Sequence, residues 1–250
     1  MKRYVALLFA FALLVSCGDD PTDINGSPDA NVQISFATQS AGAAPMFHRL
    51  ALLDDTLTSG GDTLILSSVE IVVREVELKR IEVVDCDTDP DDSCEKFEAG
   101  PFLVALPLDG TVDPTFTLDI PHGQYDEFEF EIHKVSDSDT ADADFLAANP
   151  DFLNKSIRVQ GTFNGQSFLF ESDLDVEQEL DLNPPLVIDE TTDSTNITVL
   201  VGLDGWFVDG GGNLLNPESG NKGQPNESVI KENIKQSVEA FEDDDSDGRR

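Results

Sequence analysis

The stretch LDIPHGQYDEFEFEIH, residues 118–133, carries the pattern that decides the fold. Apolar and polar residues alternate along its second half, where Phe128, Phe130 and Ile132 share one phase. Such an alternation with period two is typical of a β-strand that buries one face. Before it, residues 121–123 (Pro-His-Gly) mark a turn, because proline ends a strand and glycine accepts backbone angles that other residues avoid. The stretch therefore predicts two strands joined by a tight turn.

Similar strand signals continue on both sides of this stretch. Residues 63–84 form a long run whose spacing also fits a helix, but its β-branched content favours a strand, with a bulge near Val73. The dipeptide Asn164-Gly165 predicts a hairpin turn. Further elements are expected as strands near residues 32–36, 102–108, 115–120, 124–135, 156–163, 166–171, 176–182, 186–188 and 196–203, and as a helix over 141–148. This succession of short strands predicts an all-β fold, an antiparallel β-sandwich over residues 31–208.

The carboxyl-terminal part of the chain changes character. Residues 209–225 have the composition of a loop, and Asn226 can cap a helix that runs to Glu242. Four apolar residues form one narrow stripe on this helix: Ile230, Ile234, Val238 and Phe241. Because such a stripe is buried against another element in most surface helices, we expect a helix over 226–242 docked on the sandwich, followed by an acidic tail over 243–250.

The amino terminus has the layout of an exported lipoprotein. An apolar run over residues 4–15 follows two basic residues and is too short to span a bilayer. Residues 14–17 (Leu-Val-Ser-Cys) resemble the lipobox of bacterial lipoproteins. The resemblance implies a signal peptide over 1–16 and acyl chains, palmitate among them, that anchor Cys17 in a membrane. It also implies an outer-membrane location, because glycine and not aspartate follows the cysteine.

Residues 17–30 combine acids with turn-forming residues and contain almost nothing apolar. Such a segment cannot bury enough surface to order itself, so we expect a disordered tether between the membrane and the sandwich.

The net charge of the chain is −35, from 50 acidic and 15 basic residues. Nucleic acid is excluded as a partner, because binding to its phosphates depends on clustered lysine and arginine. The same charge repels anionic lipids, so membrane attachment would depend on acyl chains. Divalent cations, cationic partners and solubility remain as reasons for the acidity.

Two further cysteines, Cys86 and Cys94, bracket an acidic loop that contains Asp87, Asp89, Asp91 and Asp92. In an exported chain the expected state of such a pair is a disulfide. Zinc is the alternative, but two thiols without a nearby histidine offer too few ligands for a tetrahedral site.

A calcium signal stands at the carboxyl-terminal end. Asp243, Asp245 and Asp247 precede Gly248 and match D-x-D-x-D-G, the opening of an EF-hand loop entered from a helix. The bidentate glutamate that such a loop carries at position 12 has no counterpart in the two residues after the glycine. The alternative interpretation is a solvated acidic tail.

Two other sets of side chains could carry chemistry. If Phe128, Phe130 and Ile132 face the core, then Glu129, Glu131 and His133 lie together on the other face of the strand. There they could bind a transition metal or act as acid and base. The alternative is the ordinary wet side of an antiparallel strand. Trp206 could stack on a sugar, or it could be a core residue next to a strand end.

Residues 68–80 and 118–133 together resemble an uncharacterised β-sandwich domain that occurs in lipoproteins of environmental bacteria. Its shared feature is a strand, the sequence Pro-x-Gly-x-Tyr, and a second strand, as in prealbumin-like and Ig-like Greek-key sandwiches. Tyr125 occupies the tyrosine position and can bond its hydroxyl back to the backbone, as in a tyrosine corner. The resemblance implies no activity, because that family has none established, and it does not extend to the cysteine-bracketed loop or the carboxyl-terminal helix.

The sequence predicts a lipid-anchored protein of the cell envelope that acts as a non-enzymatic structural or ligand-binding module, with calcium as the candidate ion. Nucleophilic catalysis has no motif, since G-x-S-x-G is absent and His48, His122 and His133 stand in unrelated contexts. The alternative is an envelope glycan hydrolase or carbohydrate-binding protein, because 50 acidic residues make paired carboxylates inevitable. An envelope protein or a glycan is the expected partner.

Overall fold

The computed structural model describes residues 29–39, 55–81, 100–189, 192 and 194–248. The predicted signal peptide and the predicted lipid anchor at Cys17 lie outside the described residues, and so does the predicted tether up to residue 28. His48 and the proposed disulfide between Cys86 and Cys94, with the acidic loop between them, also lie outside the described residues. The last two tether residues, Asp29 and Ala30, belong to a strand instead, and Ala30 is buried, so the tether predicted over 17–30 ends too late.

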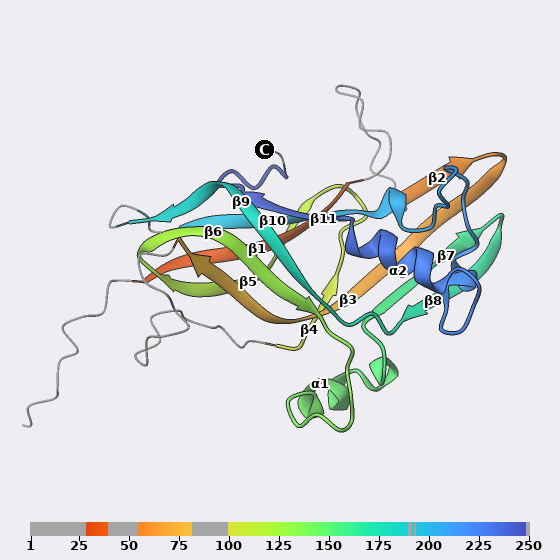
Figure 1. The fold of residues 1–250 in the computed structure, drawn as a ribbon, viewed down its shortest axis with the longest axis horizontal. Coiled ribbons are helices and arrows are strands. Elements are labelled where there is room, and N and C mark those ends of the chain that lie inside the picture. Colours follow the sequence, from red (N-terminus) through yellow and green to blue (C-terminus); the bar gives the residue numbers. More distant parts are fainter. Residues whose placement is uncertain (1–28, 40–54, 82–99, 190–191, 193, 249–250) are drawn as a thin grey trace, which may run out of the picture.

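The described part of the chain is mainly β-structure arranged in two sheets (Figure 1). The strands are β1 (Asp29–Gln39), β2 (Asp55–Ser59), β3 (Asp62–Arg80), β4 (Phe102–Ala105), β5 (Val112–Pro121), β6 (Gly123–Ile132), β7 (Ile157–Phe163), β8 (Gln166–Ser172), β9 (Val176–Ile188), β10 (Ser194–Gly202) and β11 (Val238–Glu242). The helices are α1 (Ala143–Ala148) and α2 (Glu227–Lys235), with short 3-10 turns η2 (Pro150–Phe152), η3 (Leu203–Gly205) and η4 (Pro217–Gly220).

Four strands form the smaller sheet, in the order β11-β10-β1-β5. Its central pair is parallel, because Asn31 of β1 lies opposite Ser194 of β10 and the register advances in the same direction to Gln39 and Gly202. The prediction of a purely antiparallel sandwich is therefore wrong for this sheet. Only strands joined by a short turn must be antiparallel, and β1 and β10 are far apart in the sequence.

Seven strands form the larger sheet, and β3 is its longest, with 19 residues. The strand pairs with β2, β4, β6 and β7, so one segment supports most of this sheet. The predicted bulge is confirmed close to its expected place: the register with β6 shifts between Arg74 and Glu77, and Glu75 has φ 51°. The bulge lets Val73 and Val76, three residues apart, both face the main core, whereas Val72 is buried on the opposite face with Phe145 and Phe152.

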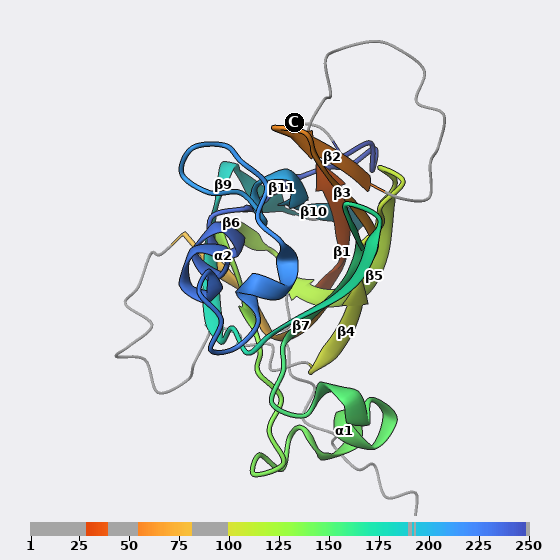
Figure 2. The same cartoon turned by 90° about the vertical axis from the view of Figure 1, so that its right-hand side faces the viewer.

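The strands β6 and β7 follow each other along β3 and meet at Val72. Its amide donates to the carbonyl of Ser156 ahead of β7 (2.8 Å), and its carbonyl accepts from the amide of His133 after β6 (3.0 Å). The chain between these two residues leaves the sheet and contains α1, which projects from the body of the molecule (Figures 1 and 2).

Apolar residues from both sheets form one core. Phe36 of β1 and Phe130 of β6 meet across it, with ring centroids 6.2 Å apart. Phe128 and Ile132 are buried in the predicted phase, and the Tyr125 hydroxyl donates to the carbonyl of Pro121 at 2.7 Å, as predicted. The turn at Asn164 and Gly165 is also confirmed, since both residues have positive φ.

The helix predicted over 226–242 is wrong in its second half. Asn226 stands at the N-cap position of α2, but its side chain donates to Ser219 and does not cap the helix. The helix ends at Lys235, and the next strand, β11, pairs with β10. An edge of β10 left bare would expose its amides and carbonyls, and pairing with β11 satisfies them.

Two smaller differences concern strand number. The segment β2 was not predicted, and the strands predicted over 176–182 and 186–188 are one continuous strand, β9.

In the described part of the chain no helix has the length and hydrophobicity needed to cross a bilayer.

Candidate functional site

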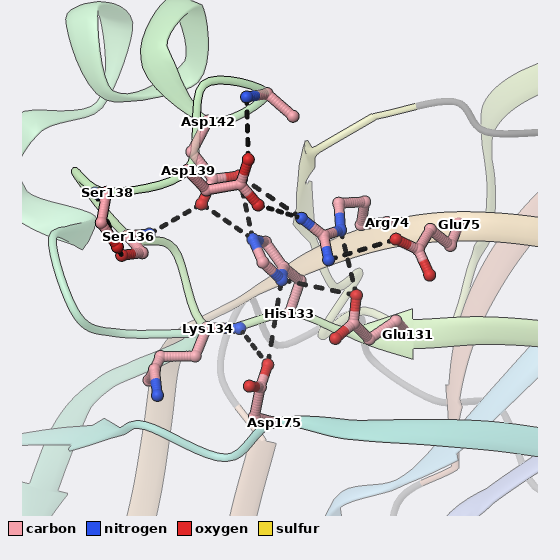
Figure 3. Close-up of polar contacts among 11 residues, drawn as sticks. Arg74, Glu75, Glu131, His133, Lys134, Ser136, Ser138, Asp139, Asp142 and Asp175 are labelled. Atoms are coloured by element: carbon pink, nitrogen blue, oxygen red, sulfur yellow. Dashed lines mark hydrogen bonds and ion pairs between the residues drawn. The ribbon is translucent and has the colours of Figure 1, made fainter.

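A buried cluster of charged side chains lies where β6 ends and the chain leaves the larger sheet. At its centre is His133, whose side chain is 6% exposed. Its Nε2 atom lies 2.9 Å from both carboxylate oxygens of Asp142, which is fully buried (Figure 3). Asp142 holds the N-cap position of α1 but makes no capping bond there. Its carboxylate instead accepts from His133 and from the amide of Ser136, at 2.7 Å.

Arg74 of β3 joins further carboxylates to this cluster. Its Nε donates to Glu131 at 3.0 Å, and its Nη1 donates to Asp139 at 2.9 Å. Its Nη2 lies 3.1 Å from Glu75, the residue at the bulge (Figure 3). The bulge thus has a consequence for the site, because it sets Arg74 and Glu75 side by side over the end of β6.

The electrostatics of the cluster follow from its composition. Burial by itself would lower the pKa of His133, but the carboxylates of Glu131 and Asp142 outweigh burial and raise it. Burial would raise the pKa of Glu131, but His133 and Arg74 outweigh it and lower the pKa. The cluster therefore favours a positive charge at or near the imidazole ring.

The outer wall of the cluster is formed by the chain ahead of β9. Asp175 Oδ1 accepts from the amide of Lys134 at 2.8 Å and lies 3.8 Å from His133 Nδ1. Beside it a pocket of about 250 Å³ is lined by Glu75, Glu131, Asp175, Val176 and Glu177. The ligand atoms of Glu131, His133 and Asp175 all lie within 4.8 Å of one another.

The structure corrects the interpretation of the row Glu129, Glu131 and His133 as the wet side of a strand. Glu129 and His133 are each 4% exposed, and Glu131 is partly buried. For His133 the reason is the excursion between β6 and β7, whose Asp142 folds back onto the ring, whereas Glu129 contacts Lys79 of β3.

Glu129 belongs to a second group, together with Glu127 of β6 and Lys79 of the neighbouring strand β3. Burial and the neighbouring Glu127 raise the pKa of Glu129 to about 7, while Lys79 opposes the rise. Hydrogen bonding with Glu129 and with Lys79 lowers the pKa of Glu127. Lys79 Nζ contacts both carboxyl groups, so the arrangement is a shared ion pair and not two carboxyl groups on either side of a substrate.

The predicted calcium ligands Asp243, Asp245 and Asp247 come together in one turn. Their ligand atoms lie within 4.8 Å of one another. The turn follows strand β11 and not a helix, so the EF-hand entry predicted for this motif is wrong. Asp243 is 3% exposed, which also contradicts a fully solvated tail, while Asp245 and Asp247 are exposed.

Asp243 is buried because its carboxylate organises the turn. Oδ2 accepts from the Thr198 hydroxyl at 2.7 Å and from the amide of Gly248 at 3.0 Å, and Oδ1 accepts from the amide of Asp247 at 3.1 Å. Asn196 extends this network, because its side-chain amide donates to the Asp243 carbonyl and its Oδ1 accepts from Ser35.

Several members of the two clusters were not predicted from the sequence. Arg74, Asp142 and Asp175 join the His133 cluster from three separate segments, and Thr198 and Asn196 join Asp243 from β10. A local signal existed only for Asp142, as the polar residue before a short helix, and that signal indicates a cap and not a partner for histidine.

Trp206 is a core residue. It is 1% exposed, and its indole N–H donates to the Ser237 hydroxyl at 2.7 Å, so this ring offers no face to a sugar. His122 lies in the turn after β5, and its carbonyl accepts from Arg80 at 2.6 Å.

The chain was compared with protein-family models, with curated proteins and with solved structures, and none of them matches it.

Proposed function

We propose that the chain is an exported lipoprotein, held in the outer membrane by acyl chains on Cys17. Its β-sandwich acts outside the cytoplasm as a non-enzymatic structural or ligand-binding module, stabilised by calcium at Asp243, Asp245 and Asp247. The proposed architecture is an Ig-like or prealbumin-like sandwich, supported by the two sheets and by the tyrosine corner at Tyr125. The strong acidity supports an anchor made of lipid rather than of basic residues.

The observation that carries the calcium proposal is the convergence of three carboxylates within 4.8 Å on the turn that follows β11. A carboxylate offers about four lone-pair sites, and the Asp243 carboxylate uses three of them within the protein. Asp245 and Asp247 supply further exposed oxygens, and calcium accepts oxygen ligands in flexible geometry. Bound there, the ion would fix the turn and with it the last strand of the smaller sheet.

Thermal unfolding with calcium and with a calcium chelator tests this proposal. We expect calcium to raise the melting midpoint, because an ion that binds only the folded state stabilises that state. The gain should disappear in the double variant Asp245→Asn, Asp247→Asn and persist in Asp126→Asn, which removes an exposed charge from β6. An equal midpoint in calcium and chelator would refute calcium binding.

The anchor is tested separately by membrane fractionation. We expect the wild-type chain to partition with membranes and Cys17→Ala to become soluble, since no other feature of the proposal holds the chain to lipid. A Cys17→Ala chain that stays with the membrane fraction would refute the lipid anchor and leave the calcium proposal intact.

A further inference from the structure

The strongest unexplained feature of the molecule is the Nδ1 atom of His133. The ring is buried, and within the described part of the chain this atom has no hydrogen-bond partner. Its close neighbours are two carboxylate oxygens, Glu131 Oε2 at 3.4 Å and Asp175 Oδ1 at 3.8 Å (Figure 3). A buried polar atom aimed between two carboxylates requires an explanation.

The opposite side of the ring fixes its tautomer. Asp142 accepts from His133 at Nε2 with both oxygens, and a carboxylate can only accept, so the ring proton resides on Nε2. In a neutral ring, Nδ1 then presents a lone pair to the oxygens of Glu131 and Asp175. That arrangement is repulsive unless a positive charge lies between the three atoms, as a second ring proton or as a metal ion.

The spacing of the three atoms fits a metal ion. Ligands about 2.0–2.2 Å from a tetrahedral zinc ion are about 3.4 Å apart, close to the 3.4 and 3.8 Å that separate Nδ1 from its two neighbours. Five carboxylates surround the site against one guanidinium, that of Arg74, so the local charge favours a cation: Glu75, Glu131, Asp139, Asp142 and Asp175.

Each of the three side chains is also held by a partner outside the triad. His133 is held by Asp142, Glu131 by Arg74, and Asp175 by the amide of Lys134. An imidazole that donates to a carboxylate through one nitrogen and binds metal through the other is the usual arrangement of metal-ligating histidines. Asp142 is in turn fixed by the amide of Ser136.

We propose that Glu131, His133 and Asp175 bind a divalent transition-metal ion of the zinc class. One imidazole nitrogen and two carboxylates suit zinc and its neighbours, whereas calcium takes six to eight oxygen ligands. Three protein ligands leave a fourth coordination position, and Glu131 and Asp175 line the pocket of about 250 Å³ through which water could reach it. The site is independent of the calcium turn, because the two share no residue.

The test uses the full chain, purified in mild detergent and stripped of metal with a chelator, with Zn²⁺ and Co²⁺ as probes. We expect Zn²⁺ to bind at one site of defined affinity and Co²⁺ at that site to give the visible absorption of four-coordinate cobalt. In Asp175→Asn the Zn²⁺ affinity should fall at least tenfold and the cobalt absorption should be lost. The matched control is Glu177→Gln, which removes the same charge from the same pocket but is not a ligand, and it should bind as wild type does.

Nuclear magnetic resonance of the His133 ring nitrogens gives a second readout that does not depend on any variant. Saturating Zn²⁺ should shift the Nδ1 resonance and leave a proton on Nε2. Equal Zn²⁺ affinity in Asp175→Asn and Glu177→Gln, or a His133 ring that stays doubly protonated at saturating Zn²⁺, would overturn the proposal and assign the positive charge to a second ring proton.

Discussion

Two acidic clusters of this molecule differ in how they are assembled. The Asp243 cluster is a motif, because its three carboxylates stand two residues apart on a single turn. The His133 cluster has no motif, because its members come from β3, β6, the excursion after β6 and the segment ahead of β9. The motif can be recognised before the structure is known, whereas the second cluster exists only once the larger sheet has formed.

The two clusters also balance their charge differently. In the turn, backbone amides and a hydroxyl donate to Asp243, so no cation is needed to satisfy that carboxylate. Around His133, a guanidinium and an imidazole face several carboxylates, and the His133 ring and Asp142 are themselves buried. Removing one side chain should therefore lower the free energy of unfolding more in the His133 cluster than in the Asp243 cluster, because it leaves a buried charge without its partner.

The largest effect is expected from Asp142→Ala. The substitution leaves His133 and the amide of Ser136 without their acceptor, and the loss of one partner from a buried ion pair costs about 3–5 kcal/mol. Urea unfolding at pH 7 measures the loss. Asp144→Ala, an exposed acid on the same helix, is the control and should change the free energy of unfolding by less than about 0.5 kcal/mol. A loss below about 1 kcal/mol for Asp142→Ala would mean that the two clusters do not differ as described.

An intermediate effect is expected from Asp243→Ala, measured by urea unfolding with chelator present so that calcium contributes nothing. The change removes the acceptor of three hydrogen bonds, and donors left unsatisfied in a buried site cost about 1–3 kcal/mol. Asp245→Ala removes an exposed carboxylate of the same motif and should cost less than about 0.5 kcal/mol. If both variants lose the same free energy of unfolding, the turn is stabilised by the charge of its carboxylates and not by the hydrogen bonds of Asp243.

The smallest effect, and a dependence on pH, is expected at Asp173, whose partners are lysines. Burial would raise its pKa, but Lys222 and Lys231 outweigh burial and lower the pKa to about 2. A carboxyl whose folded pKa lies below its unfolded value of about 3.9 stabilises the fold above pH 4, and the stabilisation is lost as pH falls towards 2. Since Lys222 is largely exposed and screened by solvent, we expect the charge of Asp173 to contribute about 1–2 kcal/mol to the free energy of unfolding.

The measurement is the free energy of unfolding of wild type and Asp173→Asn between pH 7 and pH 2.5. The difference in the free energy of unfolding between wild type and Asp173→Asn should be largest at pH 7 and should decrease below pH 4. Asp181→Asn, at an exposed position of β9, is the control. A difference that does not change with pH would show that Asp173 acts through packing and not through its charge.

The parts of the fold that follow from neighbouring residues could be predicted from the sequence. The turn at Asn164-Gly165 and the Tyr125 hydroxyl bond depend on residues within four positions of each other. The strand β11 could not be predicted, because Val238 and Phe241 fit a helical stripe equally well and only the open edge of β10 decides between the two. Long-range pairing overrides local propensity at such positions.

In the candidate site, too, only the contacts between residues close in the sequence could be predicted. Glu131 and His133 were recognised because they stand two residues apart on one strand, and two-residue spacing places side chains on one face. Asp175 and Arg74 were missed, because their contribution depends on which strands lie next to β6 and on the bulge at Glu75. The burial of His133 depends on the excursion that contains α1, whose sequence shows where a helix lies but not what it covers.

The parallel pair of β1 and β10 has a consequence for the order in which this protein can fold. Asn31 and Ser194 lie opposite each other, and β11 completes the sheet from still later in the chain. Pairing over such separations makes folding slow compared with folding through local contacts. If the chain is delivered across a membrane from its amino terminus, β1 arrives first and can pair with β5 on one edge, while its other edge stays unpaired until β10 emerges. The smaller sheet therefore closes last, and before that moment β1 is the segment most in need of protection from aggregation.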